Sequence, residues 1–133
     1  MSRRGRVVLS KVGLDGHDVG IRLVAKKLTE AGVEVVYLGK RNLPDVIVAT
    51  AIAEDVDVIG ISSLSGGLAE FTTELLELLE KEDVDIPVIT GGILEEADRD
   101  RALAAGVRHH FGPGASLAEV VDSFTALIPA QTP

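Results

Sequence analysis

Short runs of apolar residues alternate along the chain with longer segments of helical period. Five apolar runs predict strands, at residues 6–10, 33–38, 56–62, 86–90 and 107–111. The first four are rich in β-branched residues, as in a parallel sheet covered on both faces, whereas His109 and His110 interrupt the fifth. Stripes of apolar residues predict helices after each strand, at residues 19–32, 43–56, 67–82, 95–106 and 116–128.

This alternation of strand and helix predicts the fold. It indicates a flavodoxin-like (Rossmann-like) α/β fold with a doubly wound, five-stranded parallel sheet of strand order 2-1-3-4-5. Gly32 is expected to stop the first helix, Pro44 to lie in the first turn of the second, and Ser116 with Glu119 to form a capping box on the last. We expect one domain over residues 1–133, with a core from about 6 to 128 and a disordered tail at 129–133.

Composition limits the partners. The chain has 21 acidic and 13 basic residues and a net charge of −8, so it should repel nucleic acid and anionic membrane surfaces. Cysteine is absent, which excludes disulfides and thiolate metal sites. No apolar run approaches the roughly 20 residues that span a bilayer, and the first residues do not resemble a signal peptide. We therefore expect a cytoplasmic protein with no nucleic-acid or membrane partner.

In open α/β sheets, ligands bind beyond the carboxyl ends of the strands. The loops predicted there, after strands one, three, four and five, read "KVGLDGHDVG", "SSLSGG", "GGILE" and "GPGAS". Each contains glycine, and none is a dinucleotide fingerprint or a Walker A loop. The candidate chemistry of this protein is therefore expected on one edge of the sheet.

The first loop holds a candidate metal ligand. His17 can bind a metal through one ring nitrogen, and Asp15, two residues earlier, can accept the other N–H and fix the tautomer. Gly16 and Gly20 allow a bulky partner to approach the backbone, and Asp18 is placed to cap the following helix. A surface histidine beside capping aspartates explains the same residues. A bare metal site needs more ligands, so the functional interpretation requires a metal that arrives inside a cofactor.

The other loops offer polar and open positions. Ser62 can hydrogen-bond a buried ring nitrogen, with Gly66 giving a ligand room to enter, although a helix cap explains this loop as well. The pair Gly91 and Gly92 allows a flat group to lie against the backbone. The stretch from Gly112 to Gly114 precedes the last helix, whose N-terminal N–H groups suit an anion. His109 and His110 cannot both join His17, because neighbouring strand residues face opposite ways, and they are expected to be solvated or hydrogen-bonded.

These residues resemble the cobalamin-binding domain of adenosylcobalamin-dependent acyl-CoA mutases, methylmalonyl-CoA mutase in particular. The D-x-H-x-x-G motif of that family appears as Asp15 to Gly20, S-x-L as Ser62 to Leu64, and the glycine pair as Gly91 and Gly92. The flanking "KVGLDGHD", "EDVDVIGISSLSG" and "GVRHHFGPG" are also similar in order and spacing. The resemblance covers residues 6 to 128.

The resemblance implies a role for each matched residue. His17 would be the lower cobalt ligand of a base-off cofactor, and Asp15 its hydrogen-bond partner. Ser62 would hydrogen-bond the buried base, and Leu64 would line its slot. The glycines would make room for the nucleotide tail, which in this family lies between the sheet and the first helix. The candidate cofactor-binding residues are Asp15, Gly16, His17, Asp18, Gly20, Ser62, Leu64, Gly66, Gly91, Gly92, Gly112 and Gly114.

The resemblance also implies a partner. Mutases of this family use a TIM barrel to bind the acyl-CoA, and a barrel of about 250 residues does not fit in this chain. We therefore expect an isomerase subunit that is inactive without a separate large subunit, with methylmalonyl-CoA and 2-hydroxyisobutyryl-CoA mutases among the candidate types. The alternatives are a corrinoid protein of a methyltransferase system, a non-catalytic cobalamin carrier or sensor, and a response regulator. The start directly at the first strand argues against the methyltransferase protein, and Ser62 at the end of strand three against the regulator.

Overall fold

The structure, a computed structural model, describes residues 5–11, 19–39, 43–63 and 67–129. Five strands form one parallel sheet in the order β2-β1-β3-β4-β5, as the sequence predicts. The strands are β1 Arg6–Lys11, β2 Glu34–Gly39, β3 Val58–Ser63, β4 Val88–Gly92 and β5 His109–Phe111. The helices are α1 Val19–Glu30, α2 Pro44–Ala53, α3 Leu68–Lys81, α4 Glu96–Ala105 and α5 Leu117–Leu127. None of the helices in these ranges is long and apolar enough to cross a membrane.

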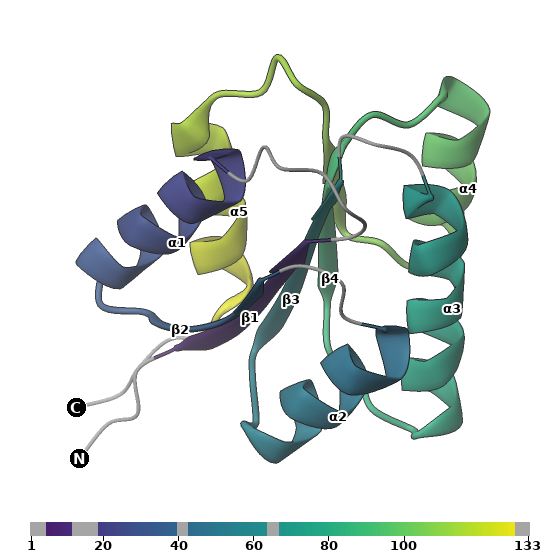
Figure 1. The fold of residues 1–133 in the computed structure, drawn as a ribbon, viewed down its shortest axis with the longest axis horizontal. Coiled ribbons are helices and arrows are strands. Elements are labelled where there is room, and N and C mark those ends of the chain that lie inside the picture. Colours follow the sequence, from purple (N-terminus) through teal and green to yellow (C-terminus); the bar gives the residue numbers. More distant parts are fainter. Residues whose placement is uncertain (1–4, 12–18, 40–42, 64–66, 130–133) are drawn as a thin grey trace.

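The helices cover the sheet in two layers (Figure 1). Helices α1 and α5 lie on one face, while α2, α3 and α4 lie on the other. Because side chains alternate along each strand, β1 to β4 each contribute to two separate apolar clusters, while β5 contributes Phe111 to one of them. The larger cluster, under α2, α3 and α4, includes Val8, Ile59, Leu75 and Val88, and the smaller, under α1 and α5, includes Val7, Leu28, Val58 and Phe124.

The helix ends follow the predicted signals closely. Pro44 occupies the first turn of α2, where its missing N–H interrupts no hydrogen bond. The hydroxyl of Ser116 caps α5 by accepting the backbone N–H of Glu119 at 3.1 Å. Gly32 follows α1 with a positive φ of 91°, which only glycine adopts at little cost.

Strands β3 and β4 lie about two residues further along the chain than predicted. Pro87 lacks an N–H for the ladder, so the apolar pair before Val88 does not extend β4. At the other end, Ser62 pairs with Gly91, and Ser63 with Gly92, in the ladder between β3 and β4. The candidate residues Ser62, Gly91 and Gly92 therefore belong to the ends of strands and not to loops, which fixes their backbones within the sheet.

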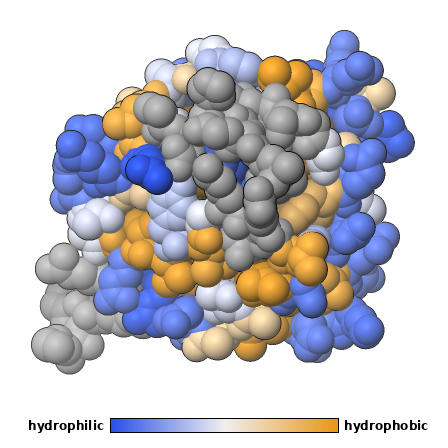
Figure 2. All heavy atoms as spheres, viewed as in Figure 1, coloured by the Kyte–Doolittle hydropathy of each residue, from blue (hydrophilic) through white to orange (hydrophobic). Residues whose placement is uncertain are grey.

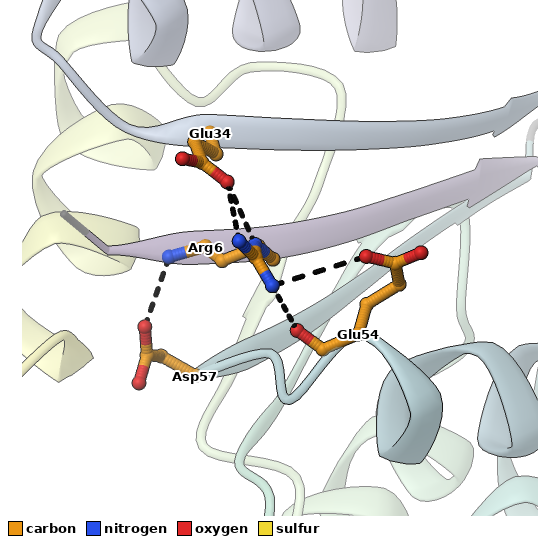
Figure 3. Close-up of polar contacts among 4 residues, drawn as sticks. All are labelled: Arg6, Glu34, Glu54 and Asp57. Carbon is orange, nitrogen blue, oxygen red and sulfur yellow. Dashed lines mark hydrogen bonds and ion pairs between the residues drawn. The ribbon is translucent and has the colours of Figure 1, made fainter. Parts of the chain in front are cut away.

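A polar network ties the elements together at the amino edge of the sheet (Figure 3). The guanidinium of Arg6 donates to the Glu34 carboxylate at 2.8 Å and to the Glu54 carbonyl at 2.6 Å. The backbone N–H of Arg6 donates to the Asp57 carboxylate at 2.9 Å. One residue of β1 thus connects β2 and the segment between α2 and β3.

Candidate functional site

A cavity of about 370 Å³ lies between the sheet and the pair of helices α1 and α5. Ile21, Leu23 and Val24 of α1 form one side of it, and Leu117, Val120 and Phe124 of α5 form another. The carboxyl ends of β3, β4 and β5 form the floor. Leu23 remains 43% exposed, so the cavity is open to solvent beside α1. Its volume falls within the range of roughly 300–1,000 Å³ typical of small-molecule sites.

Strand register explains why the cavity exists. Ser62, Gly91 and Phe111 stand side by side on β3, β4 and β5, and all three line the cavity. The preceding row on this face consists of Leu9, Gly60 and Ile89. Of the six residues of these two rows that line the cavity, three carry a hydrogen atom or a single hydroxymethyl group as a side chain. The sheet is therefore hollowed where α1 and α5 cross it.

The glycines differ in what they do for the cavity. A Cβ atom added at Gly91 would have the carbonyl oxygen of Phe111 as its nearest neighbour, at 3.8 Å, and one added at Gly20 would meet nothing within 4 Å. Side chains at these two positions would have room, and Gly91 leaves that room to the cavity. Gly92, in contrast, has a φ of +129°, and a Cβ there would overlap the carbonyl oxygen of Ser63. Gly92 is thus required by the backbone itself.

Sequence reasoning missed Gly60 and the two phenylalanines. A Cβ at Gly60 would overlap the side chains of Phe124 and Leu9, so this glycine lets Phe124 of α5 lie against the sheet. Phe111 and Phe124 supply the aromatic surface of the cavity. A glycine inside the strand pattern "VIGIS" is the signal that could have found this close approach.

The structure brings together five of the predicted site residues. Gly20, Ser62, Gly91, Gly92 and Gly112 all line the cavity, although they come from four different parts of the chain. Gly114 is not among the lining residues. The remaining candidates lie outside the described residues: Asp15, Gly16, His17, Asp18, Leu64 and Gly66.

Lys11 is a buried cation next to this site that the sequence reasoning did not single out. It is the last residue of β1, is only 2% exposed, and pairs in register with Ser62. Lysine is seldom buried to this degree. Lys11 directly follows the apolar run of the first strand and begins the candidate loop. This position is the sequence signal that could have identified it.

The two histidines of β5 lie on opposite faces of the sheet, as expected. His109 is exposed and stacks on Phe111 with ring centroids 5.9 Å apart. His110 is partly buried, and its Nδ1 lies 2.7 Å from the hydroxyl oxygen of Thr90. Burial lowers the pKa of His110, and the charge of Arg99 lowers it further, while a hydrogen bond to the backbone of Gly92 opposes both. The neutral ring is therefore favoured.

The start of α5 borders the cavity. Gly112, Pro113 and Ala115 line it just before the helix begins. The Ser116 hydroxyl already accepts the N–H of Glu119, so this donor of the first turn is occupied. The anion site predicted at this helix end stays a prediction that depends on the other N–H groups.

Metal-binding side chains are sparse in the part of the chain that the structure describes. No group of three or more His, Asp or Glu residues there is placed to hold a metal ion. The cavity can instead hold an organic ligand: its walls are mainly aliphatic and aromatic, Ser62 offers a hydroxyl, and Gly91 leaves space at the backbone. These features fit the nucleotide tail of a corrinoid, with a hydrogen-bonding group for a ring nitrogen and apolar surface for the ring.

Comparison with known families agrees with this class of site. The model of the B12-binding domain family matches residues 5–122. The chain therefore belongs to the B12-binding domain family.

Two relatives are similar over nearly the whole chain. The small subunit of 2-hydroxyisobutanoyl-CoA mutase from Aquincola tertiaricarbonis is 39% identical over 127 residues, which cover 95% of this chain and 93% of that subunit. The small subunit of pivalyl-CoA mutase from Xanthobacter autotrophicus is 44% identical over 123 residues, which cover 92% of this chain and 82% of that subunit. Both relatives are subunits of acyl-CoA mutases, which are isomerases.

Among solved structures, a cobalamin-binding protein from Desulfitobacterium hafniense superposes with a TM-score of 0.80. The superposition covers 95% of this chain and 60% of that chain, at 22% sequence identity. At this level of identity the likeness shows the fold alone, and it agrees with the flavodoxin-like arrangement of the sheet and helices.

Proposed function

We propose that this protein is the cobalamin-binding small subunit of a heteromeric, adenosylcobalamin-dependent acyl-CoA mutase. The observation that carries the proposal is the cavity between the sheet and helices α1 and α5, whose floor contains Ser62 and Gly91 side by side. Membership of the B12-binding domain family and the two small-subunit relatives support the same assignment. When bound, adenosylcobalamin would supply a cobalt–carbon bond whose homolysis starts a radical rearrangement of the carbon skeleton.

In this proposal the chain holds the cofactor in its base-off form. The nucleotide tail occupies the cavity, where the Ser62 hydroxyl hydrogen-bonds the base and Phe111 and Phe124 contact its ring. His17 is the lower cobalt ligand, and Asp15 accepts its other ring N–H and keeps the imidazole in the metal-binding tautomer. A cytoplasmic location goes with this proposal and stays a prediction from the sequence.

The partner in this proposal is a large subunit with a TIM barrel that binds the acyl-CoA. Large exposed apolar side chains lie near the carboxyl edge of the sheet: Leu43 is 64% and Ile93 60% exposed. Figure 2 shows apolar surface over β2 and α2, while the surface over α3 and α4 is mainly hydrophilic. These exposed apolar side chains, beside the hydrophilic surface of α3 and α4, suit contact with a second subunit.

Paramagnetic resonance of cob(II)alamin on the protein tests the cofactor assignment. Protein with ¹⁵N-labelled histidine should show coupling of cobalt to one histidine nitrogen, and the coupling should disappear in His17→Ala. Coupling only to the cofactor's own dimethylbenzimidazole nitrogen would contradict base-off binding. The Asp15→Asn variant should keep the coupling but lose about 10- to 100-fold in affinity or activity.

An activity assay tests the subunit assignment separately. The isolated chain with adenosylcobalamin should convert no acyl-CoA, and conversion should begin when a large mutase subunit is added. Comparison of 2-hydroxyisobutyryl-CoA, pivalyl-CoA and methylmalonyl-CoA would then identify the substrate. Turnover by this chain alone would contradict the proposal, since the substrate-binding residues are assigned to the partner.

A further inference from the structure

We propose that His110 is a positioning residue for the cavity, which acts by holding the carboxyl ends of β4 and β5 together from the opposite face of the sheet. The inference rests on the proposed function, because it assigns the cavity to the nucleotide tail of a corrinoid. His110 does not touch the ligand. It fixes the position of the cavity wall, which does touch the ligand.

The contact itself is short and partly buried. Nδ1 of His110 lies 2.7 Å from the hydroxyl oxygen of Thr90, and Thr90 is fully buried. The ring also has a hydrogen bond to the backbone of Gly92. A single imidazole therefore engages the residues on both sides of Gly91. Gly91 is the position that leaves the cavity wall without a side chain.

This wall depends on a short strand. Strand β5 has three residues and pairs only with β4 in the described sheet, through Ile89 with His109, Thr90 with His110 and Gly91 with Phe111. Phe111, Gly112 and Pro113 follow directly and line the cavity. With so few ladder contacts, the side-chain link between His110 and Thr90 contributes a large share of what fixes the distance between Gly91 and Phe111.

The position of His110 separates this role from direct binding. Phe111 and Ile89 belong to the apolar cluster under α1 and α5, whereas His110 and Thr90 point to the other face, where α4 packs on β5. Neither side chain can reach a ligand through the sheet. Replacement of either side chain should therefore change the affinity for the ligand only by moving the cavity wall that Gly91 and Phe111 form.

Protonation should weaken the link. A neutral ring can accept the Thr90 hydroxyl at Nδ1, whereas a protonated ring can only donate to the hydroxyl oxygen and brings a charge into a partly buried position. The charged group that acts on the ring from α4 is Arg99, which lies 3.7 Å from Asp100, and it disfavours the second proton, as burial does. The neutral form should thus persist below the ordinary histidine pKa of about 6.5, and in more acidic solution the charge on the ring should weaken the packing between β4 and β5.

The experiment compares two corrinoids that differ only in the tail. Hydroxocobalamin carries the nucleotide tail, whereas cobinamide lacks it and does not fill the cavity. In His110→Phe and in Thr90→Val, the affinity for hydroxocobalamin should fall by about three- to tenfold, as for the loss of one buried hydrogen bond, and the affinity for cobinamide should stay unchanged. The double variant should lose no more than His110→Phe alone, because that change already removes the link to Thr90.

Thr72→Val is the matched control. Thr72 is also buried, but its hydroxyl bonds the Leu68 carbonyl within α3 at 2.7 Å, away from the cavity. Its removal should leave the ratio of the two affinities unchanged. Thermal unfolding of each variant shows whether the fold is intact, and the two single variants provide independent measurements if one of them is unstable.

A pH series supplies a readout that a purely structural role would not move. The ratio of cobalamin to cobinamide affinity should fall more steeply in acid for the parent than for His110→Phe, because only the parent has a titrating ring at this position. Equal losses for both corrinoids, or no loss, would overturn the role of His110 and leave the proposed function standing. Failure of the parent to bind hydroxocobalamin would overturn both.

Discussion

The two faces of the sheet are built from the same strands but differ in packing. Toward α2, α3 and α4 the middle row consists of Val8, Ile59 and Val88, which are all at most 1% exposed. Toward α1 and α5 the corresponding row has Gly60 at its centre, and the next has Ser62 beside Gly91. Alternation along "VIGISS" produces this difference, because Ile59 and Ile61 face one side while Gly60 and Ser62 face the other.

The difference separates stability from binding within one small protein. The packed face buries most of the aliphatic side chains and should carry most of the free energy of unfolding. The hollow face leaves a cavity under α1 and α5, and a ligand can complete its packing. The comparison can be tested by changing residues of each face and measuring unfolding and cobalamin binding side by side.

The largest expected effect is on the packed face. Leu75→Ala removes a fully buried side chain from the larger cluster and should lower the free energy of unfolding by about 2–5 kcal/mol. Val120→Ala should cost much less, because this side chain is only partly buried and borders the cavity. Denaturant titration measures both, and equal losses would show that the hollow face is packed as tightly as the other.

The next effect should appear in binding and not in stability. Gly91→Val places a β-branched side chain, which strands favour, where a Cβ has its nearest neighbour at 3.8 Å. The protein should fold with unchanged or slightly higher stability, while cobalamin affinity should fall by about 1–3 kcal/mol because the cavity is filled. Gly91→Ala should give a smaller loss. Full affinity in the valine variant would contradict the use of this cavity by the cofactor.

Neighbouring serines provide a matched pair of smaller changes. Ser62 lines the cavity, while Ser63 is 1% exposed and faces the packed side. Ser62→Ala should weaken cobalamin binding by about 1 kcal/mol and leave unfolding nearly unchanged. Ser63→Ala should do the reverse, with the loss confined to unfolding. Calorimetric titration measures the binding of the two variants, and thermal unfolding measures their stability. A loss of binding in Ser63→Ala alone would refute the assignment of cofactor binding to the face that carries Ser62.

The smallest effect is expected at the amino edge, far from the cavity. Arg6→Met removes the contacts with Glu34 and Glu54 but keeps most of the apolar stem. Because these contacts are exposed to water, the unfolding temperature should fall only slightly, and less at high salt than at low salt. Cobalamin affinity should not change. A clear loss of affinity would mean that the two edges of the sheet are coupled.

The sequence by itself determined the order of elements and the edge at which the site lies. Runs of β-branched residues alternating with helical stripes predict the five strands, the five helices and the strand order, which the structure confirms. Local chemistry also placed the helix ends at Pro44 and Ser116. These features follow from neighbouring residues, so one-dimensional patterns contain them. Predictions for Asp15 and His17 come from the same patterns and stay predictions.

Only the tertiary structure decided how residues from distant segments meet. It placed Ser62, Gly91 and Phe111 in one row and showed that Gly60 admits Phe124, because strand register and helix approach depend on contacts across the sheet. It also distinguished Gly91, which leaves space, from Gly92, which the backbone requires. The link between His110 and Thr90 joins residues 20 positions apart, and no local pattern predicts it. Such pairs arise from the ladder between β4 and β5, where register alone sets which side chains face each other.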